Sequence, residues 1–244
     1  MSEHRKVALV TGGAIRVGRA IATELASAGF DIAFTYHTSE DAARTLTAEL
    51  EAAGHRVLAI AADLTQPRMR PPVVARVEAE LGGLDALVNS AAVFTRTRLA
   101  DLTEERFTDV LRTNLEAPVF LSLAAARALR VRHGAIVNIA DIYGAFPLRD
   151  YLAYSVSKAA LVAATRSLAV ELAPEVRVNA VAPGIAIFPP DYTEAVKERM
   201  LSRTLLQREG GGEVIGRAVR YLLEDADTMT GQVLTLDGGR TVAL

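Results

Sequence analysis

The chain lacks cysteine altogether, which excludes a disulfide framework, a thiolate metal site and a cysteine nucleophile. It is also poor in histidine, because only His4, His37, His55 and His133 occur and none stands at metal-ligand spacing from another. We therefore expect no bound metal. A chain without cysteine fits the reducing cytosol, and we expect a cytoplasmic protein.

An excess of positive charge is missing as well. Lys and Arg number 27 against 29 Asp and Glu, which gives a formal net charge of -2 at pH 7. Proteins that bind nucleic acid or anionic lipid through charge usually carry the opposite balance. No apolar run approaches the roughly 20 residues of a membrane helix, and the short polar stretch before Val7–Val10 has no signal-peptide pattern. From these absences we expect no nucleic-acid partner and no membrane partner.

What the sequence does contain is an alternation of short apolar runs with longer segments of helical periodicity. This pattern predicts an α/β fold, with a Rossmann-like, doubly wound, parallel seven-stranded sheet and helices on both faces. We expect a single domain over residues 1–244, because a chain of this length can bury one large core. The expected strands are Val7–Val10, Ile32–Tyr36, Val57–Ala61, Ala86–Asn89, Ala135–Ile139, Val176–Val181 and Gln232–Leu236. The expected helices are Val17–Ala28, Ser39–Ala53, Val73–Leu81, Glu104–Leu129, Ala153–Leu172, Thr193–Leu201 and Glu213–Leu223, with Pro71-Pro72 as a helix start and Pro189-Pro190 in a loop.

A glycine-rich turn follows the first expected strand. Residues 11–18 read Thr-Gly-Gly-Ala-Ile-Arg-Val-Gly and lead directly into a helix. Gly12 would let the backbone approach a pyrophosphate, and the helix N-terminus supplies oriented N–H groups beside Arg16 and Val17. Such a turn can also serve only to join a strand to a helix, so its meaning depends on the other motifs.

Polar residues follow the next strands at the positions where a dinucleotide would lie. NAD enzymes place an acid about 20 residues after the glycine turn to bind the ribose 2′-hydroxyl. Here the second strand is followed by His37, Thr38 and Ser39, without an acid, which favours the 2′-phosphate of NADPH. Further candidate cofactor contacts are Asp63, Leu64, Asn89, Ala91, Pro183 and Gly184, although Asp63 could instead cap a turn.

Tyr154 and Lys158 stand four residues apart near the start of an expected helix, so the phenol and the ammonium share one helix face. A free phenol titrates near ~10 and is a serviceable proton donor, and a neighbouring cation would lower that pKa. Taken alone, such a pair is usually an ordinary surface pair. The sequence order of all the motifs gives it weight.

From the glycine turn through Asn89, Asn114, Tyr154 and Lys158 to Asp237-Gly238-Gly239, that order resembles the short-chain dehydrogenase/reductase family over nearly the whole chain. The resemblance implies that Asn114, Tyr154 and Lys158 belong to the catalytic tetrad and its proton relay. The fourth member is ordinarily a serine thirteen residues before the tyrosine, and here Asp141 occupies that place. An ionised carboxylate would repel the oxyanion of a carbonyl substrate, so ordinary ketone reduction is disfavoured.

Within the family, the departures resemble pteridine reductases. Arg16 replaces the usual third glycine, and the resemblance implies that it contacts both cofactor and pterin. Phe94 is placed like the phenylalanine that stacks the pterin against nicotinamide, and Asp141 matches an aspartate of that group. His37-Thr38-Ser39 is similar to the group's His-Arg-Ser, with Thr38 in place of the arginine.

These resemblances predict NADPH-dependent reduction of a dihydropterin or dihydrofolate to the tetrahydro form. Tyr154 and Asp141 would deliver the proton, Lys158 would bind the nicotinamide ribose, and Asn114 would hold a relay water. Arg16, Phe94, Asp141 and Tyr154 would contact the substrate, and Tyr143, Leu148 and Tyr151 would help to line the mouth of the site. Family members are usually tetramers built from the two long helices, so we expect a homotetramer.

Three alternatives remain open on sequence alone. Asp141 could cap a loop in an altered enzyme. The chain could be a short-chain reductase for a different imine or carbonyl substrate. It could also bind NADPH as a sensor without turnover, although intact Tyr154 and Lys158 argue against that alternative.

Overall fold

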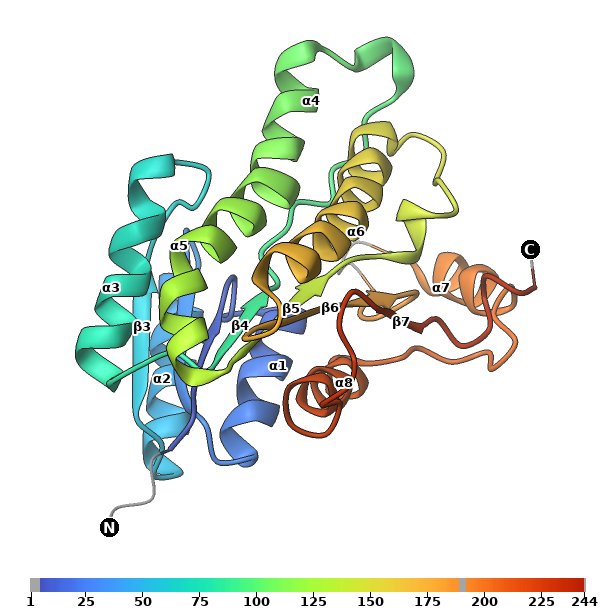
Figure 1. Ribbon diagram of the computed structural model, residues 1–244. Coiled ribbons are helices and arrows are strands. Elements are labelled where there is room, and N and C mark those ends of the chain that lie inside the picture. The colour runs from blue at the N-terminus through green and yellow to red at the C-terminus, as the bar shows by residue number, and fades with distance from the viewer. Residues whose placement is uncertain (1–4, 189–191, 244) are drawn as a thin grey trace.

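The computed structural model describes residues 5–188 and 192–243. In this part of the chain the strands form a seven-stranded sheet in the order β3-β2-β1-β4-β5-β6-β7, with every neighbouring pair parallel (Figure 1). The strands are β1 (Val7–Val10), β2 (Asp31–Tyr36), β3 (Val57–Ala61), β4 (Ala86–Asn89), β5 (Ala135–Ile139), β6 (Arg177–Pro183) and β7 (Val233–Leu236). The predicted doubly wound parallel sheet is confirmed. The loop predicted at Pro189-Pro190 lies outside the described residues, as does His4.

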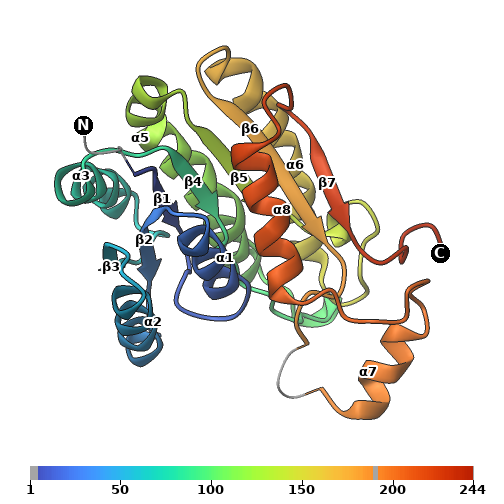
Figure 2. The same cartoon turned by 90° about the horizontal axis from the view of Figure 1, so that it is seen from below.

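Helices cover both faces of the sheet. Figure 2 shows α3, α5 and α6 on one side of the strands and α1, α2 and α8 on the other. The helices are α1 (Arg16–Ser27), α2 (Glu40–Ala52), α3 (Arg70–Leu81), α4 (Glu104–Leu111), α5 (Ala117–Arg132), α6 (Leu152–Leu172), α7 (Glu194–Leu201) and α8 (Gly212–Glu224). As expected, α3 begins at the proline pair, because a proline in the first turn lacks only an N–H that would have no helical partner.

The strand sequences explain the two-sided core. Side chains alternate between the faces of a strand, so Val7 and Leu9 of β1 pack with the α3, α5 and α6 side, while Ala8 and Val10 pack with the α1 and α8 side. All four residues are fully buried. A strand buried on both faces reads as a continuous apolar run, which is why the central strands were visible in the sequence.

The prediction of one continuous helix over Glu104–Leu129 is wrong in one respect. Between α4 and α5 the chain forms one π-helical turn at Arg112–Glu116, and α5 continues to Arg132. Pro118 lies directly after this turn, and it lacks the N–H that would bond to the carbonyl of Asn114 and would crowd that carbonyl in a regular α-helix. The wider turn accommodates the proline and places Asn114 against the loop after β4.

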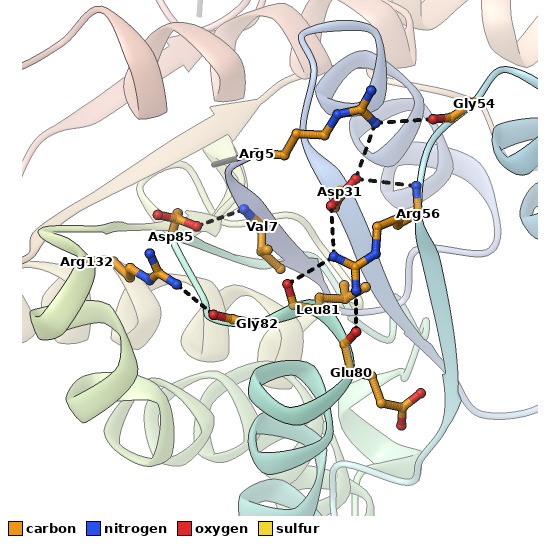
Figure 3. Close-up of polar contacts among 10 residues, drawn as sticks. All are labelled: Arg5, Val7, Asp31, Gly54, Arg56, Glu80, Leu81, Gly82, Asp85 and Arg132. Carbon is orange, nitrogen blue, oxygen red and sulfur yellow. Dashed lines mark hydrogen bonds and ion pairs between the residues drawn. The ribbon is translucent and has the colours of Figure 1, made fainter. Parts of the chain in front are cut away.

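Ion pairs and hydrogen bonds close the amino-terminal edge of the sheet (Figure 3). The buried carboxylate of Asp31 lies 3.6 Å from a guanidinium nitrogen of Arg5 and 3.6 Å from one of Arg56. Nearby, the Val7 N–H donates to Asp85 at 2.8 Å. These contacts connect the starts of β1, β2 and β3. Doubly wound sheets bind their ligands at the opposite end, beyond the carboxyl ends of the strands.

Two further observations bear on function. No helix in residues 5–188 and 192–243 has the length and apolar character needed to cross a membrane. Over the same residues, no three His, Asp or Glu side chains gather closely enough to hold a metal ion.

Candidate active site

A cavity of about 530 Å³ opens at the carboxyl ends of the strands. This edge is where doubly wound sheets bind their ligands. It collects nearly all of the residues predicted from the sequence, and of those residues only Asn89, Asn114 and Tyr151 are absent from its lining. The predicted residues that line it are Gly12, Arg16, Val17, His37, Thr38, Ser39, Asp63, Leu64, Ala91, Phe94, Asp141, Tyr154, Lys158, Pro183 and Gly184.

The glycine turn forms a backbone cradle at the start of α1. Gly12 has a φ of +63°, and a Cβ there would lie 3.0 Å from the Cα of Ala91. A Cβ on Gly18 would lie 2.2 Å from the carbonyl oxygen of Gly12, so a side chain at either position would disrupt the turn. The Gly12 N–H donates to the Thr35 hydroxyl at 3.2 Å and fixes the turn to β2. The cradle and the helix N-terminus fit the pyrophosphate of a dinucleotide.

Arg16 occupies an uncommon backbone conformation. Its φ of +52° lies in the left-handed region, which costs a residue with a side chain roughly 1–2 kcal/mol. This explains why glycine is usual at this position. The Arg16 guanidinium crosses to the loop after β6 and donates to the Ile187 carbonyl oxygen at 2.8 Å. Since both residues line the cavity, Arg16 connects the phosphate cradle to the segment that borders the substrate end.

The residues after β2 form one end of the cavity, where the sequence predicts the adenosine of the cofactor. Ser39 stands at the N-cap of α2, but its hydroxyl makes no capping hydrogen bond. That hydroxyl and the N-terminus of α2 therefore remain available to an anion beside His37 and Thr38. Two acids, Glu40 and Asp41, follow in the first turn of α2, and Arg44 contacts both and offsets their charge.

Asp63 caps a turn, which was one of the two alternatives that the sequence offered, and it also lines the cavity. Its carboxylate accepts hydrogen bonds from the Thr65 hydroxyl at 2.6 Å and the Thr65 N–H at 3.0 Å, which is a turn-capping arrangement. The Thr65 hydroxyl bond, with further bonds and the charge of His37, lowers the pKa of Asp63. Asp63 also lines the cavity, where an ionised carboxylate can accept from an adenine amino group.

Tyr154 and Asp141 meet at the other end of the cavity. The Tyr154 hydroxyl donates to Asp141 Oδ2 at 2.8 Å, and the Tyr143 N–H donates to Asp141 Oδ1 at 2.8 Å. Burial raises the pKa of Asp141 above its ordinary value, although these bonds and the charge of Lys158 oppose the shift. A carboxyl in this position holds a proton more readily than one in water.

The pKa of Tyr154 is shifted in the direction opposite to the sequence-based prediction. Burial, and then the charge of Asp141, raise the pKa of Tyr154 well above 10. The prediction that a neighbouring ammonium would lower this pKa is wrong, because burial and the facing carboxylate act more strongly. Tyr154 is therefore a neutral phenol near pH 7 and suits the role of proton donor.

Lys158 lies one turn further along α6, as its spacing predicted. Its Nζ donates to the Ile139 carbonyl oxygen at 2.7 Å and lies 5.7 Å from the centre of the Tyr154 ring. Burial lowers the pKa of Lys158 to about 8. The side chain thus carries a positive charge at neutral pH on the floor of the cavity.

Asn89 and Asn114, two of the predicted residues outside the lining, support the site from behind. Asn114 accepts from the Val93 N–H at 2.9 Å and donates to the Val93 carbonyl at 3.0 Å, which fixes the segment leading to Phe94. Asn89 donates to Ser122 at 3.1 Å and to Asn138 at 2.8 Å inside the core. The Asn114 bonds fix the backbone beside the cavity, whereas the Asn89 bonds link β4 to α5 and β5. The relay water expected at Asn114 stays a prediction.

Phe94 forms an aromatic wall at the cavity mouth. Its ring stacks on Tyr151 with centroids 4.4 Å apart and meets the edge of Tyr154 at 4.7 Å. Phe94 remains 41% exposed and lines the cavity together with Tyr143 and Leu148. Sequence reasoning did not find the lining contributed after β6, because no motif marks a segment that tertiary contacts position. Those residues are Ile185, Ala186, Ile187, Phe188, Tyr192 and Met200.

Comparisons with known proteins agree with this geometry. The family model described as Enoyl-(Acyl carrier protein) reductase matches residues 13–241. The 3-oxoacyl-[acyl-carrier-protein] reductase FabG of Staphylococcus aureus (strain Mu50) is 36% identical over 242 residues, covering 96% of this chain and 97% of the relative. FabG of Escherichia coli (strain K12) is 35% identical over 246 residues, covering 98% of each.

Among solved structures, a blue fluorescent protein from a metagenomic library, in complex with NADPH, is 33% identical with a TM-score of 0.90, covering 96% of this chain and 97% of that one. The chain therefore belongs to the short-chain dehydrogenase/reductase family, as an oxidoreductase of the NAD(P)-dependent reductase kind.

Proposed function

We propose that the chain is an NADPH-dependent pteridine reductase, which reduces a C=N bond of a dihydropterin or dihydrofolate. The observation that carries this proposal is the 2.8 Å hydrogen bond between Tyr154 and Asp141, at the position where the family ordinarily has serine. Bound reduced nicotinamide supplies the hydride. The substrate nitrogen must gain a proton at the same time, and a phenol paired with a proton-holding carboxyl can deliver it.

The other residues of the site suit a flat, nitrogen-rich ring. Phe94 offers a platform for an aromatic heterocycle at the cavity mouth. Asp141 can accept hydrogen bonds from an amino-pyrimidine, and Arg16 extends from the phosphate cradle toward Ile187. Lys158, whose ammonium donates to the Ile139 carbonyl oxygen, would hold the nicotinamide ribose.

Carbonyl reduction is the second candidate, because the curated relatives are named as 3-oxoacyl-[acyl-carrier-protein] reductases. At 35–36% identity the relatives share the fold, while the substrate depends on individual side chains in the cavity. Against this candidate, Asp141 stands where the family ordinarily has the serine that polarises a carbonyl, and whenever its carboxyl is ionised it would repel the oxyanion that forms.

A panel of dihydrobiopterin, dihydrofolate, a cyclic imine and a 3-oxoacyl thioester, assayed by NADPH consumption, separates the candidates. We expect the highest kcat/KM with a pterin. A higher value with the 3-oxoacyl thioester would overturn the pterin proposal, and NADPH binding without turnover of any compound would favour a sensor.

The adenosine end predicts a cofactor preference. Since Thr38 and Ser39 leave room for a 2′-phosphate at the start of α2, kcat/KM should be at least about 10-fold higher with NADPH than with NADH. Thr38→Asp should reverse this preference, because a carboxylate repels the phosphate. Thr45→Asp, an exposed position of α2 outside the cavity lining, is the control and should leave the ratio unchanged. Equal kcat/KM for both cofactors in the unmodified enzyme would contradict the prediction.

We also propose that the protein is a homotetramer that packs through α5 and α6. Both helices carry large apolar side chains on the surface: Phe120, Leu123 and Val131 on α5, and Leu152, Val156 and Val170 on α6. Large apolar side chains exposed on two helices that contact each other are a common mark of an interface between subunits. Light scattering at micromolar concentration should give a tetramer, and Leu123→Glu should dissociate it. A monomeric unmodified protein would contradict this proposal.

A further inference from the structure

Three exposed arginines lie on the two segments that continue from the lining of the cavity. Arg96 and Arg98 follow Phe94 in the chain, and Arg149 follows Leu148. Phe94 and Leu148 line the cavity, whereas the three arginines are exposed to solvent. The mouth therefore changes from aromatic to cationic within a few residues. We call Arg96, Arg98 and Arg149 the arginine rim.

The two segments that carry the rim are fixed to each other. Thr97 and Tyr151 form a parallel β-bridge, and the Thr97 N–H donates to the Asp150 carbonyl oxygen at 2.7 Å. The Phe94 ring stacks on Tyr151 across the same junction. The backbone thus holds the rim beside the aromatic wall of the cavity.

The charges of the rim are only partly compensated. Arg96 binds the Asp150 carboxylate through Nη2 at 2.6 Å and Nε at 3.2 Å. That hydrogen bond, together with the charges of Arg149 and Arg98, lowers the pKa of Asp150. Among the described residues, Arg98 and Arg149 have no ion-pair partner. One carboxylate therefore faces three guanidinium groups, two of which can bind an external anion.

We propose that the arginine rim binds the carboxylate tail of a folate-type substrate, an inference that rests on the proposed pteridine reductase function. A dihydrofolate carries, in order, a pterin, a benzoyl ring and a glutamate. The site offers a cavity lined by Asp141 and Phe94 for the pterin, and the segments that continue from this lining carry the arginines, which suits a tail that extends out of the cavity. Guanidinium groups bind carboxylates through paired hydrogen bonds, which suits them to the glutamate.

An acidic carrier protein is the competing occupant, because the relatives are named for acyl-carrier-protein substrates. A stable protein interface covers roughly 800 Å² on each partner, with charged groups distributed over its rim. Here the cationic groups are three side chains next to one opening, which is the scale of a small-molecule tail.

The test removes the two unpaired charges with Arg98→Gln and Arg149→Gln together. With NADPH saturating, KM for dihydrofolate should rise about 3–10-fold while kcat stays unchanged, and dihydrobiopterin, whose side chain is uncharged, should keep both constants. Added salt should raise KM for dihydrofolate in the unmodified enzyme and have little effect in the variant. Arg76→Gln with Arg217→Gln, on α3 and α8, removes the same amount of charge elsewhere. This control should change neither KM nor kcat for either substrate.

Calorimetric binding of dihydrofolate is measured alongside turnover, so the rim is tested separately from catalysis. Equal dihydrofolate affinity in the rim variant and the unmodified protein would overturn the inference, as would an equal loss for both pterins. A defect found only with a 3-oxoacyl carrier-protein substrate would also overturn it and assign the rim to that protein. Failure of the unmodified enzyme to reduce either pterin would contradict the proposed function instead.

Discussion

Tyr154→Phe is expected to lower kcat with a pterin by about 10²–10⁴-fold, the usual contribution of a general acid, while NADPH affinity stays nearly unchanged. The substitution keeps the ring that meets the edge of Phe94 and removes only the hydroxyl that donates to Asp141. Because the loss affects proton delivery rather than binding, kcat and kcat/KM should fall by similar factors.

Single-turnover kinetics should be used, so that product release does not mask the chemical step. NADPH affinity is followed by fluorescence titration. Tyr221→Phe on α8 is a matched control, because it removes a phenol hydroxyl whose contact, with the Met229 sulfur at 3.9 Å, lies away from the cavity lining. A Tyr154→Phe enzyme with unmodified kcat in a step limited by chemistry would show that Tyr154 is not the proton donor.

Periodicity predicted the sheet well because its central strands are buried on both faces. Val7–Val10 and Ala86–Asn89 were assigned with the same bounds that the structure gives. Periodicity could not detect the π-helical turn at Arg112–Glu116, because a change in hydrogen-bond register leaves the apolar pattern nearly intact. Pro118 was the available signal, since a proline within an expected long helix marks a break.

For the site, position in the fold was predictable and electrostatics were not. Residues that directly follow strands, such as Asp63 and Asp141, reach the same edge of a parallel sheet, so their gathering follows from the strand assignment. The pKa of Tyr154 depends on burial and on the carboxylate that faces it, neither of which the Tyr154–Lys158 spacing reports. The strained backbone of Arg16 was likewise visible only in three dimensions.

Asp141→Ser should lower kcat/KM with a pterin by at least about 10-fold, because a charge-assisted hydrogen bond of roughly 1.5–3 kcal/mol corresponds to one to two decades in rate. Serine restores the family's usual residue but cannot share a proton with Tyr154 as a carboxyl does. A carbonyl reductase should be unharmed or improved by the same change, since serine stabilises an oxyanion. The variant thus distinguishes the two candidate functions within one fold.

The pH dependence of Asp141→Ser follows from the raised pKa of Asp141. As pH rises through that pKa, the carboxyl loses its proton, so kcat/KM of the unmodified enzyme with a pterin should fall. This limb should be missing from the Asp141→Ser profile. Lys158, whose pKa is about 8, causes a change of kcat/KM with pH in both enzymes. The decrease that is absent from the variant is therefore the one caused by the Asp141 carboxyl.

Thermal unfolding shows whether Asp141→Ser is properly folded. The difference in Tm between the variant and the unmodified protein should also change with pH in one direction. A carboxyl whose folded-state pKa is raised adds stability below its unfolded value of about 3.8, and this contribution is lost as pH rises through the folded-state pKa. The Tm of Asp141→Ser relative to the unmodified protein should therefore increase from acidic to neutral pH. If the folded variant keeps full activity with pterins across this range, Asp141 does not share the transferred proton, and the family assignment stands without the proposed mechanism.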